Sequence, residues 1–517
     1  MAVDVGRRPR CSLADVSASD LLAVGLLWAA LYLLYASALT TIYYGFDEGW
    51  LIRDEQHSPL ELARYMLVHR GLFNGRPVSY AVWGFQLSIG STPAGLQAIR
   101  LALFVIATLT AALFYVVLRR RRVPPSWACF VVLLVWSQPV VQIYYAVSLR
   151  TTYWLGVWCS VGAFFVLRGA GPGTLRAAAP RLLAAAGLLM VSWTTFQATP
   201  FCGLAVSSFY ALRCAPERWP AERRGHLAFA GTLLVTMVVY VAAYKVLYDF
   251  GNPEKTYRLA DRVLSSVFSA SLPEHVDLLR WMNYAGPFEW WNYPSPVSPL
   301  SDGCYLWATF ATAAVWLAVL VGALVKEGAH ALVRYAVAFA AVALTFLPLV
   351  ADGFSARQNP YIACVPAVVL TLAQALAVVL RPLWTHALPR RTVTACAWIL
   401  LLVVCVGARR GFDHALVEPN ARFYASVVAQ VRDHATADID RVLVVTIPST
   451  CPAEPCRGVF GYRASLATRR DLPEFYRGIV RELTGKVGTP VTFTDSVGLA
   501  AEDRAGALVI SFDGLVE

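Results

Sequence analysis

An adjacent pair of carboxylates, Asp47 and Glu48, has the clearest chemical potential in this sequence. The pair directly follows an apolar run, and ionised side chains at a membrane boundary are costly unless they face water or a functional site. A positioned carboxylate can act as a general base that takes the proton from an attacking hydroxyl group. The pair could equally cap the next helix or lie among lipid headgroups, and these two residues alone leave both interpretations open.

A phosphate leaving group would need positive charge close to it. Arg357 is the only basic residue in the segment 351–360, and Tyr361 follows at the start of an apolar run. We predict that Arg357 contacts a phosphate and that Tyr361 lies beside it, the alternative being an arginine that only reaches the membrane interface. Other cations in comparable positions are Arg76, Arg100, Arg150 and Lys245.

An aromatic cluster occupies residues 281–293, where six of thirteen side chains are Trp, Tyr or Phe. Trp290 and Trp291 could stack on sugar rings or flank a prenyl chain. A belt of aromatic side chains at the membrane interface is the favoured alternative.

Composition limits the elements that can position these residues. The chain has 517 residues, of which 57% are hydrophobic and 15% charged, whereas soluble proteins carry about 25% charged residues. This excludes one large soluble enzyme and an intrinsically disordered chain. Because a helix needs about 20 apolar residues to cross a membrane, we predict a polytopic α-helical membrane protein with about eleven transmembrane helices. They are expected near 21–43, 99–118, 126–145, 151–167, 182–197, 199–212, 227–248, 303–325, 331–350, 361–380 and 392–407.

The charge distribution orients the predicted helices. The net charge is +11, and residues 408–517 carry 13 basic and 14 acidic side chains, so the excess lies in residues 1–407. It forms short clusters between alternate apolar runs, as the positive-inside rule expects, and does not resemble a surface that binds nucleic acid. We predict a cytoplasmic N-terminal tail at 1–20, a transmembrane part at 21–407 and an outward C-terminus. No cleavable signal peptide is expected, since the first apolar run is too long.

Three outward segments stand out by their length, namely 44–98, 249–302 and 408–517. The last is predicted to be a small extracytoplasmic α/β domain. Its expected helices cover 422–434 and 471–484, and its expected strands cover 441–447, 490–494 and 507–512. Cys451 and Cys456 are predicted to form a disulfide in an oxidising compartment. A zinc site is disfavoured because no second pair of ligands accompanies them.

The acidic pair after the first span, the long first outward loop and the segment 90–100 that opens the second span resemble the GT-C membrane glycosyltransferases. The similarity is to the protein mannosyltransferase and aminoarabinose transferase branch, and it covers residues 20–380 in the order of spans and loops. The sequence motifs themselves are similar only in residues 40–100 and 352–370. The resemblance implies that Asp47 is the catalytic carboxylate and that Glu48 is a structural or binding group. Only Pro77 stands where relatives often have consecutive prolines, so the donor or the acceptor could differ from theirs.

The resemblance implies an inverting glycosyltransferase of the bacterial inner membrane. It would move a sugar from a polyprenyl-phosphate carrier to an envelope glycan, lipid or protein on the extracytoplasmic face. Membrane lipids would be further partners, and nucleic acid would not be a partner. No cofactor would be required, and the sequence leaves open whether Mg²⁺ or Mn²⁺ is used. The 40 arginines and four lysines are typical of a high-GC genome. The alternatives are a flippase or transporter of lipid-linked glycans, a polymerase or ligase that uses a diphosphate-linked donor, and a scaffold that presents the tail as a binding module.

Overall fold

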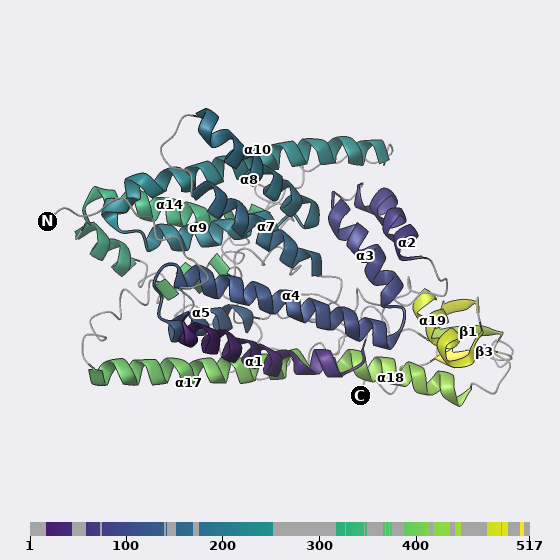
Figure 1. Ribbon diagram of the computed structural model, residues 1–517. Coiled ribbons are helices and arrows are strands. Elements are labelled where there is room, and N and C mark those ends of the chain that lie inside the picture. The colour runs from purple at the N-terminus through teal and green to yellow at the C-terminus, as the bar shows by residue number, and fades with distance from the viewer. Residues whose placement is uncertain are drawn as a thin grey trace, which may run out of the picture.

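The computed structural model of the protein is a bundle of long helices with a small sheet at one end (Figure 1). It describes residues 17–43, 58–72, 75–138, 141, 151–168, 175–251, 317–325, 327–345, 347–348, 366–367, 369–371, 373–374, 387–413, 417–434, 440–445, 473–486, 489–494 and 507–510. Helices α1, α4, α10 and α17 extend along the same direction in this view and define the long axis of the bundle.

Four helices in the described part of the chain are long and apolar enough to cross a membrane. They are α1 (Ala18–Thr40), α4 (Pro93–Arg119), α10 (Trp219–Gly251) and α17 (Ala387–Phe412). Shorter apolar helices are found at Pro125–Trp136, Thr199–Leu212 and Ala331–Leu344. The chain is therefore a helical protein with segments suited to a membrane, and each predicted span contains residues that the structure describes as helical.

Several boundaries differ from the predicted spans, and two of the differences have a clear local reason. Helix α5 (Pro125–Trp136) ends at Trp136 and is shorter than the span expected at 126–145. A proline follows at position 139, and the residue before a proline disfavours helical backbone. Helix α10 begins at Trp219 and not at 227. Its first turns contain charged residues that hydropathy excludes from a span but that a helix accepts readily.

Helix α1 has the character of a membrane helix on all its faces. Ser17 caps its first turn by accepting a hydrogen bond from the backbone N–H of Asp20, whose side chain completes a capping box. Leu27 and Leu31 are fully buried against the bundle, while Leu22 and Leu26 on other faces are more than half exposed. Apolar side chains on both the buried and the exposed faces are expected of a helix that lipid surrounds.

The interior of the bundle is formed by α7 (Thr151–Arg168), α8 (Leu175–Thr195), the 3-10 turn η5 (Thr199–Phe201) and α9 (Cys202–Leu212). Every residue of α9 is buried. Phe164 of α7 is fully buried and packs edge-to-face against Tyr210 of α9 and Phe229 of α10. This dense aromatic packing fixes the positions of the helices that carry the polar groups described below.

Basic clusters from different loops lie together at one end of the bundle. Arg119 at the end of α4 forms an ion pair with Asp20 at the start of α1, with 2.6 Å between Nε and Oδ1. Arg121 and Arg168 both pair with Glu222 in the first turns of α10. The loops predicted to share one side of the membrane are thus in contact with one another.

Strands and two amphipathic helices make up the C-terminal part. Helices α18 (Glu418–Asp433) and α19 (Pro473–Thr484) accompany strands β1 (Arg441–Val445), β2 (Val491–Thr494) and β3 (Ala507–Ile510). The sheet is parallel with strand order β2-β1-β3, so β1 is central and its Val442 and Val444 are fully buried. Each element lies within a few residues of its predicted position. This part lies at the opposite end of the long axis from the basic clusters (Figure 1).

Contacts with α1 hold the junction between α17 and α18. The hydroxyl of Ser37 donates a hydrogen bond to Asp413, and the guanidinium of Arg409 donates to the carbonyl oxygen of Leu33. Arg409 also pairs with Asp413, with 3.4 Å between the charged atoms. The C-terminal part is therefore anchored on the last turns of α1, directly before the segment that contains the acidic pair.

Candidate functional site

The described residues include only part of the predicted site. Arg76 and Arg100 are described, and Lys245 is described on α10. The predicted residues outside the described part of the chain are Asp47, Glu48, Arg150, Trp290, Trp291, Arg357, Tyr361, Cys451 and Cys456. The predictions for these residues stay predictions, and the geometry below concerns the end of the bundle from which the acidic pair emerges.

Arg100 holds the chain at the end of α1 through contacts with Thr41 and Tyr43, which we call the Arg100 clamp. The residue lies in the second turn of α4, which begins after Thr92 caps the backbone N–H of Gly95. Its side chain is 1% exposed, and its Nη2 donates a hydrogen bond of 2.6 Å to the carbonyl oxygen of Tyr43. Nη1 lies 3.4 Å from the carbonyl oxygen of Thr41. The guanidinium carbon is 3.5 Å from the centre of the Tyr43 ring, close enough for a cation–π interaction.

These contacts favour a positioning role for Arg100 over direct contact with a substrate phosphate. A buried guanidinium that donates to backbone carbonyl groups fixes the path of the chain at Thr41 and Tyr43. Asp47 follows only four residues after Tyr43. An ionisable side chain inside a predicted span with named polar partners is a marker of a functional region.

A helical hairpin is found in the long segment between α1 and α4. Helix α2 (Pro59–Met66) begins with a capping box between Ser58 and Glu61 and continues into the π-helical turn η3 (Leu67–Gly71). Helix α3 (Pro77–Ile89) returns antiparallel to it in close contact. A Cβ atom on Gly84 of α3 would lie 2.3 Å from the Cα atom of Ala63, so only glycine allows this approach of the two helices.

Arg76 at the start of α3 is held by a chain of hydrogen bonds. Its Nε donates to the side-chain oxygen of Gln197 over 2.7 Å, and its guanidinium carbon is 4.7 Å from the centre of the Phe196 ring. The amide of Gln197 donates to the hydroxyl of Tyr240 over 2.9 Å. Tyr240 in turn donates to the carbonyl oxygen of Gly75 over 2.8 Å, which closes the chain beside Arg76. Gly75 has a φ of +68°, a conformation that favours glycine.

The terminal nitrogens of Arg76 have no partner among the residues that the structure describes. The residue is half-buried, and none of the described ion pairs includes it. Its Nε and its ring contact fix the guanidinium while Nη1 and Nη2 stay available. A guanidinium held in this way can recognise a phosphate or carboxylate group through two parallel hydrogen bonds.

Buried hydrogen bonds between α3, α7 and the turn after α8 hold α3, and with it Arg76, in place. The hydroxyl of Ser79 on α3 donates to the carbonyl oxygen of Thr195 over 2.5 Å and lies 2.8 Å from the hydroxyl of Thr152 on α7. Ser192 and Thr199 share a further hydrogen bond of 2.9 Å in the turn after α8. Because these groups are buried and paired, they fix α3 against α7 and α8.

Gln197 and Tyr240 were not among the predicted site residues. Gln197 was visible as a polar residue in an otherwise apolar helical hairpin at 182–212, and that was the only available signal. Tyr240 lies inside the seventh predicted span, where nothing in its sequence context distinguishes it from a core tyrosine.

Arg76 directly precedes α3, and Arg100 lies in the second turn of α4, the next helix along the chain. Within the described residues, no group of three or more His, Cys, Asp or Glu side chains could hold a metal ion.

No protein-family model matches the chain, and a search of curated proteins gives no match.

Proposed function

We propose that this protein is a membrane glycosyltransferase whose active site lies at the end of the bundle that contains the last turn of α1 and the α2–α3 hairpin. The single observation that carries the proposal is the Arg100 clamp, which fixes the backbone of Thr41 and Tyr43 directly before Asp47 and Glu48. A general base must be held within hydrogen-bond reach of the proton that it removes. A rigid anchor four residues upstream supports that role for Asp47.

The proposed reaction is one displacement at the anomeric carbon of a sugar linked to a polyprenyl phosphate. The acceptor hydroxyl oxygen forms a bond to the anomeric carbon, and the bond from this carbon to the phosphate oxygen breaks, with inversion of configuration. Asp47 accepts the hydroxyl proton, and the carrier phosphate leaves with the bonding electrons. Arg357 is proposed to neutralise this phosphate, and Glu48 to bind substrate beside Asp47.

Arg76 is proposed to hold an anionic or polar group of the second substrate. Its fixed Nε and available terminal nitrogens support such a role. The loop at 249–302, with Trp290 and Trp291, is proposed to close over the bound sugar.

We further infer eleven transmembrane helices, a cytoplasmic N-terminus and an extracytoplasmic C-terminal α/β domain in the inner membrane of a bacterium. Two observations support this topology. The basic loop ends meet at one end of the bundle, and the sheet lies at the other end, beyond α1 (Figure 1).

The experiment combines envelope-glycan analysis with an assay of the purified protein. A strain that lacks the protein is complemented with wild type, with Asp47→Asn, or with Asp433→Asn as a matched control on the exposed surface of α18. We expect wild type and Asp433→Asn to restore a missing glycan residue and Asp47→Asn not to do so. The detergent-solubilised wild-type protein should also transfer sugar from a polyprenyl-phosphate donor.

The solubilised assay separates the enzyme from a flippase or transporter, since transport requires two compartments and transfer does not. Full restoration of the glycan by Asp47→Asn would exclude Asp47 as the base. If the deletion strain lacks a glycan residue but the solubilised protein transfers no sugar, the results would favour a flippase or transporter.

A further inference from the structure

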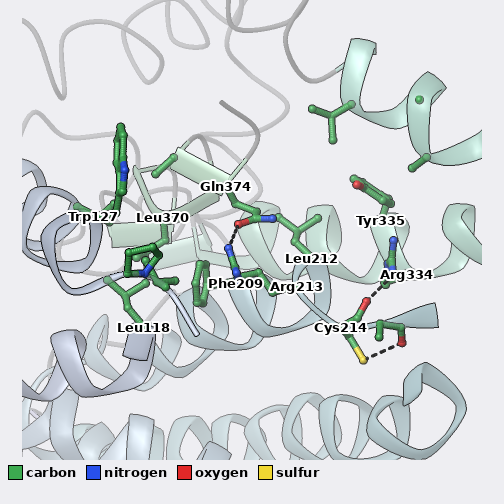
Figure 2. Close-up of a pocket in the computed structure, with 18 of the residues that line it drawn as sticks. Leu118, Trp127, Phe209, Leu212, Arg213, Cys214, Arg334, Tyr335, Leu370 and Gln374 are labelled. Atoms are coloured by element: carbon green, nitrogen blue, oxygen red, sulfur yellow. Dashed lines mark hydrogen bonds between the residues drawn. The ribbon is translucent and has the colours of Figure 1, made fainter. Parts of the chain in front are cut away.

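A large cavity opens at the basic end of the bundle, far from the proposed active site. Its volume is 1460 Å³, which exceeds the roughly 300–1,000 Å³ of ordinary small-molecule pockets. The cavity lies where α4 and α9 end and where α5, α14 (Ala329–Thr345) and α17 begin (Figure 2). None of the residues proposed for glycosyl transfer lines it.

The described walls combine a broad apolar surface with an excess of positive charge. Apolar lining residues include Leu118, Trp127, Val131, Phe209 and Leu370. The charged lining residues are three arginines and one glutamate, namely Arg213, Arg334, Arg391 and Glu327. The cavity thus has the mixed character that suits an amphiphilic molecule with a negative charge.

Arg213 carries a charge that no carboxylate neutralises in the described part of the chain. It follows the last residue of α9, and its Nη1 donates a hydrogen bond of 2.9 Å to the side-chain oxygen of Gln374. Burial, together with the nearby Arg121, lowers the pKa of the Arg213 guanidinium from its usual value. A partly buried cation beside an open cavity is a ready partner for an anion.

Arg334 supplies a second cation with an unused donor. It is 4% exposed, donates 2.5 Å from Nη1 to the carbonyl oxygen of Cys214, and pairs with Glu327 over 2.6 Å. Its Nε is buried and has no hydrogen-bond partner among the described residues. A buried N–H group without a partner destabilises the folded protein. Arg334 bonds to Cys214, the residue after Arg213, but the two guanidinium groups point to different parts of the lining: Arg213 lies toward Gln374 and Arg334 lies beside Cys214 (Figure 2).

We propose that this cavity binds an anionic phospholipid, with the phosphate against Arg213, an acyl chain along the apolar walls and Arg334 adding to the positive charge of the lining. The volume and the apolar walls favour a lipid over a free phosphate ion. The location supports the same ligand, because basic pockets between helices at the cytoplasmic side of membrane proteins recognise anionic headgroups. The proposal depends on the charges and shape of the cavity and not on the glycosyltransferase activity.

The test measures lipid binding to the delipidated full-length protein in detergent by native mass spectrometry. The probes are phosphatidylglycerol and phosphatidylethanolamine with identical acyl chains, and inorganic phosphate alone. Wild type should bind one phosphatidylglycerol at least about tenfold more tightly than phosphatidylethanolamine, because both lipids have the phosphate but only phosphatidylethanolamine adds an ammonium group that the excess of arginines repels. Arg213→Gln should reduce this preference to about twofold or less. The control Arg218→Gln removes the same charge from an exposed position five residues away and should behave as wild type.

Salt provides a second measurement that does not depend on any variant. Phosphatidylglycerol binding to wild type should weaken as NaCl is raised, because added ions screen the attraction, whereas phosphatidylethanolamine binding should not. Equal binding of the two lipids to wild type, or equal loss of preference in Arg213→Gln and Arg218→Gln, would overturn the proposal. Inorganic phosphate that binds as tightly as the lipid would show that the cavity is a phosphate site and not a lipid site.

Discussion

At the scale of single residues, Arg76 and Arg100 have different environments, so we expect their substitution to change different kinetic constants. Arg100 is buried and donates to backbone carbonyl groups, so we expect it to control the reactive geometry. Arg100→Lys keeps the charge, but a lysine cannot donate to both carbonyl groups while lying flat over the Tyr43 ring. The variant should lower kcat by roughly 10- to 100-fold, corresponding to one or two charge-assisted hydrogen bonds, with KM for the donor little changed. Wild-type kcat in the correctly inserted Arg100→Lys protein would contradict the clamp.

Arg76 should show the opposite kinetic pattern. Its terminal nitrogens are available to a ligand, so Arg76→Gln should raise the KM for one substrate by about tenfold or more and leave kcat largely intact. Gln197→Leu removes the partner that fixes the Arg76 Nε and should give a smaller change in the same constant. The control is Arg64→Gln, which removes an exposed arginine of α2 at the same end of the bundle. Equal KM values for Arg76→Gln and Arg64→Gln would exclude a binding role for Arg76.

At the scale of elements, the close approach of α2 and α3 determines where Arg76 lies. Gly84→Ala places a Cβ atom 2.3 Å from the Cα atom of Ala63 and must separate the two helices. We expect a loss of about 1–3 kcal/mol of stability, typical of overpacking, measured as a lower midpoint of thermal unfolding in detergent. Gly25→Ala on α1 is the matched control, since nothing lies within 4 Å of its added Cβ atom. The control should be neutral or slightly stabilising, because alanine favours helix over glycine. Similar midpoints for the two variants would contradict the packing argument.

The same elements show what a sequence can predict. The apolar runs at 21–43 and 99–118 predicted α1 and α4 because burial in lipid depends on local composition alone. Hydropathy alone predicts only a long loop where α2 and α3 form a hairpin, although Ser58, Pro59 and Glu61 form a recognisable capping signature. The hydrogen bond from Arg100 to Tyr43 joins residues 57 positions apart, and no local pattern indicates such a contact. Arg76 was identified as a candidate, but its partners Gln197 and Tyr240 became apparent only in three dimensions.

At the scale of the whole molecule, charge and architecture indicate one orientation. The clusters around Arg119, Arg121 and Arg168 converge on acidic partners at one end of the bundle. By the positive-inside rule, we expect that end to face the cytoplasm. The opposite end contains the α2–α3 hairpin, the exit of α1 and the parallel sheet (Figure 1). The proposed catalytic end and the proposed lipid cavity would then face different sides of the membrane.

This orientation predicts the accessibility of two exposed positions. Arg64 lies on α2, and Arg223 lies in the first turns of α10 at the basic end. Arg64→Cys and Arg223→Cys are made in a Cys396→Ser background, because Cys396 is an exposed free thiol. A membrane-impermeant maleimide added to intact spheroplasts should label position 64 above the background, and position 223 only after the membrane is opened. The reverse pattern would place the α2–α3 hairpin in the cytoplasm, away from any extracytoplasmic acceptor. It would therefore exclude glycosyl transfer at the extracytoplasmic face. The lipid cavity would then face the outer leaflet and would have to be tested there.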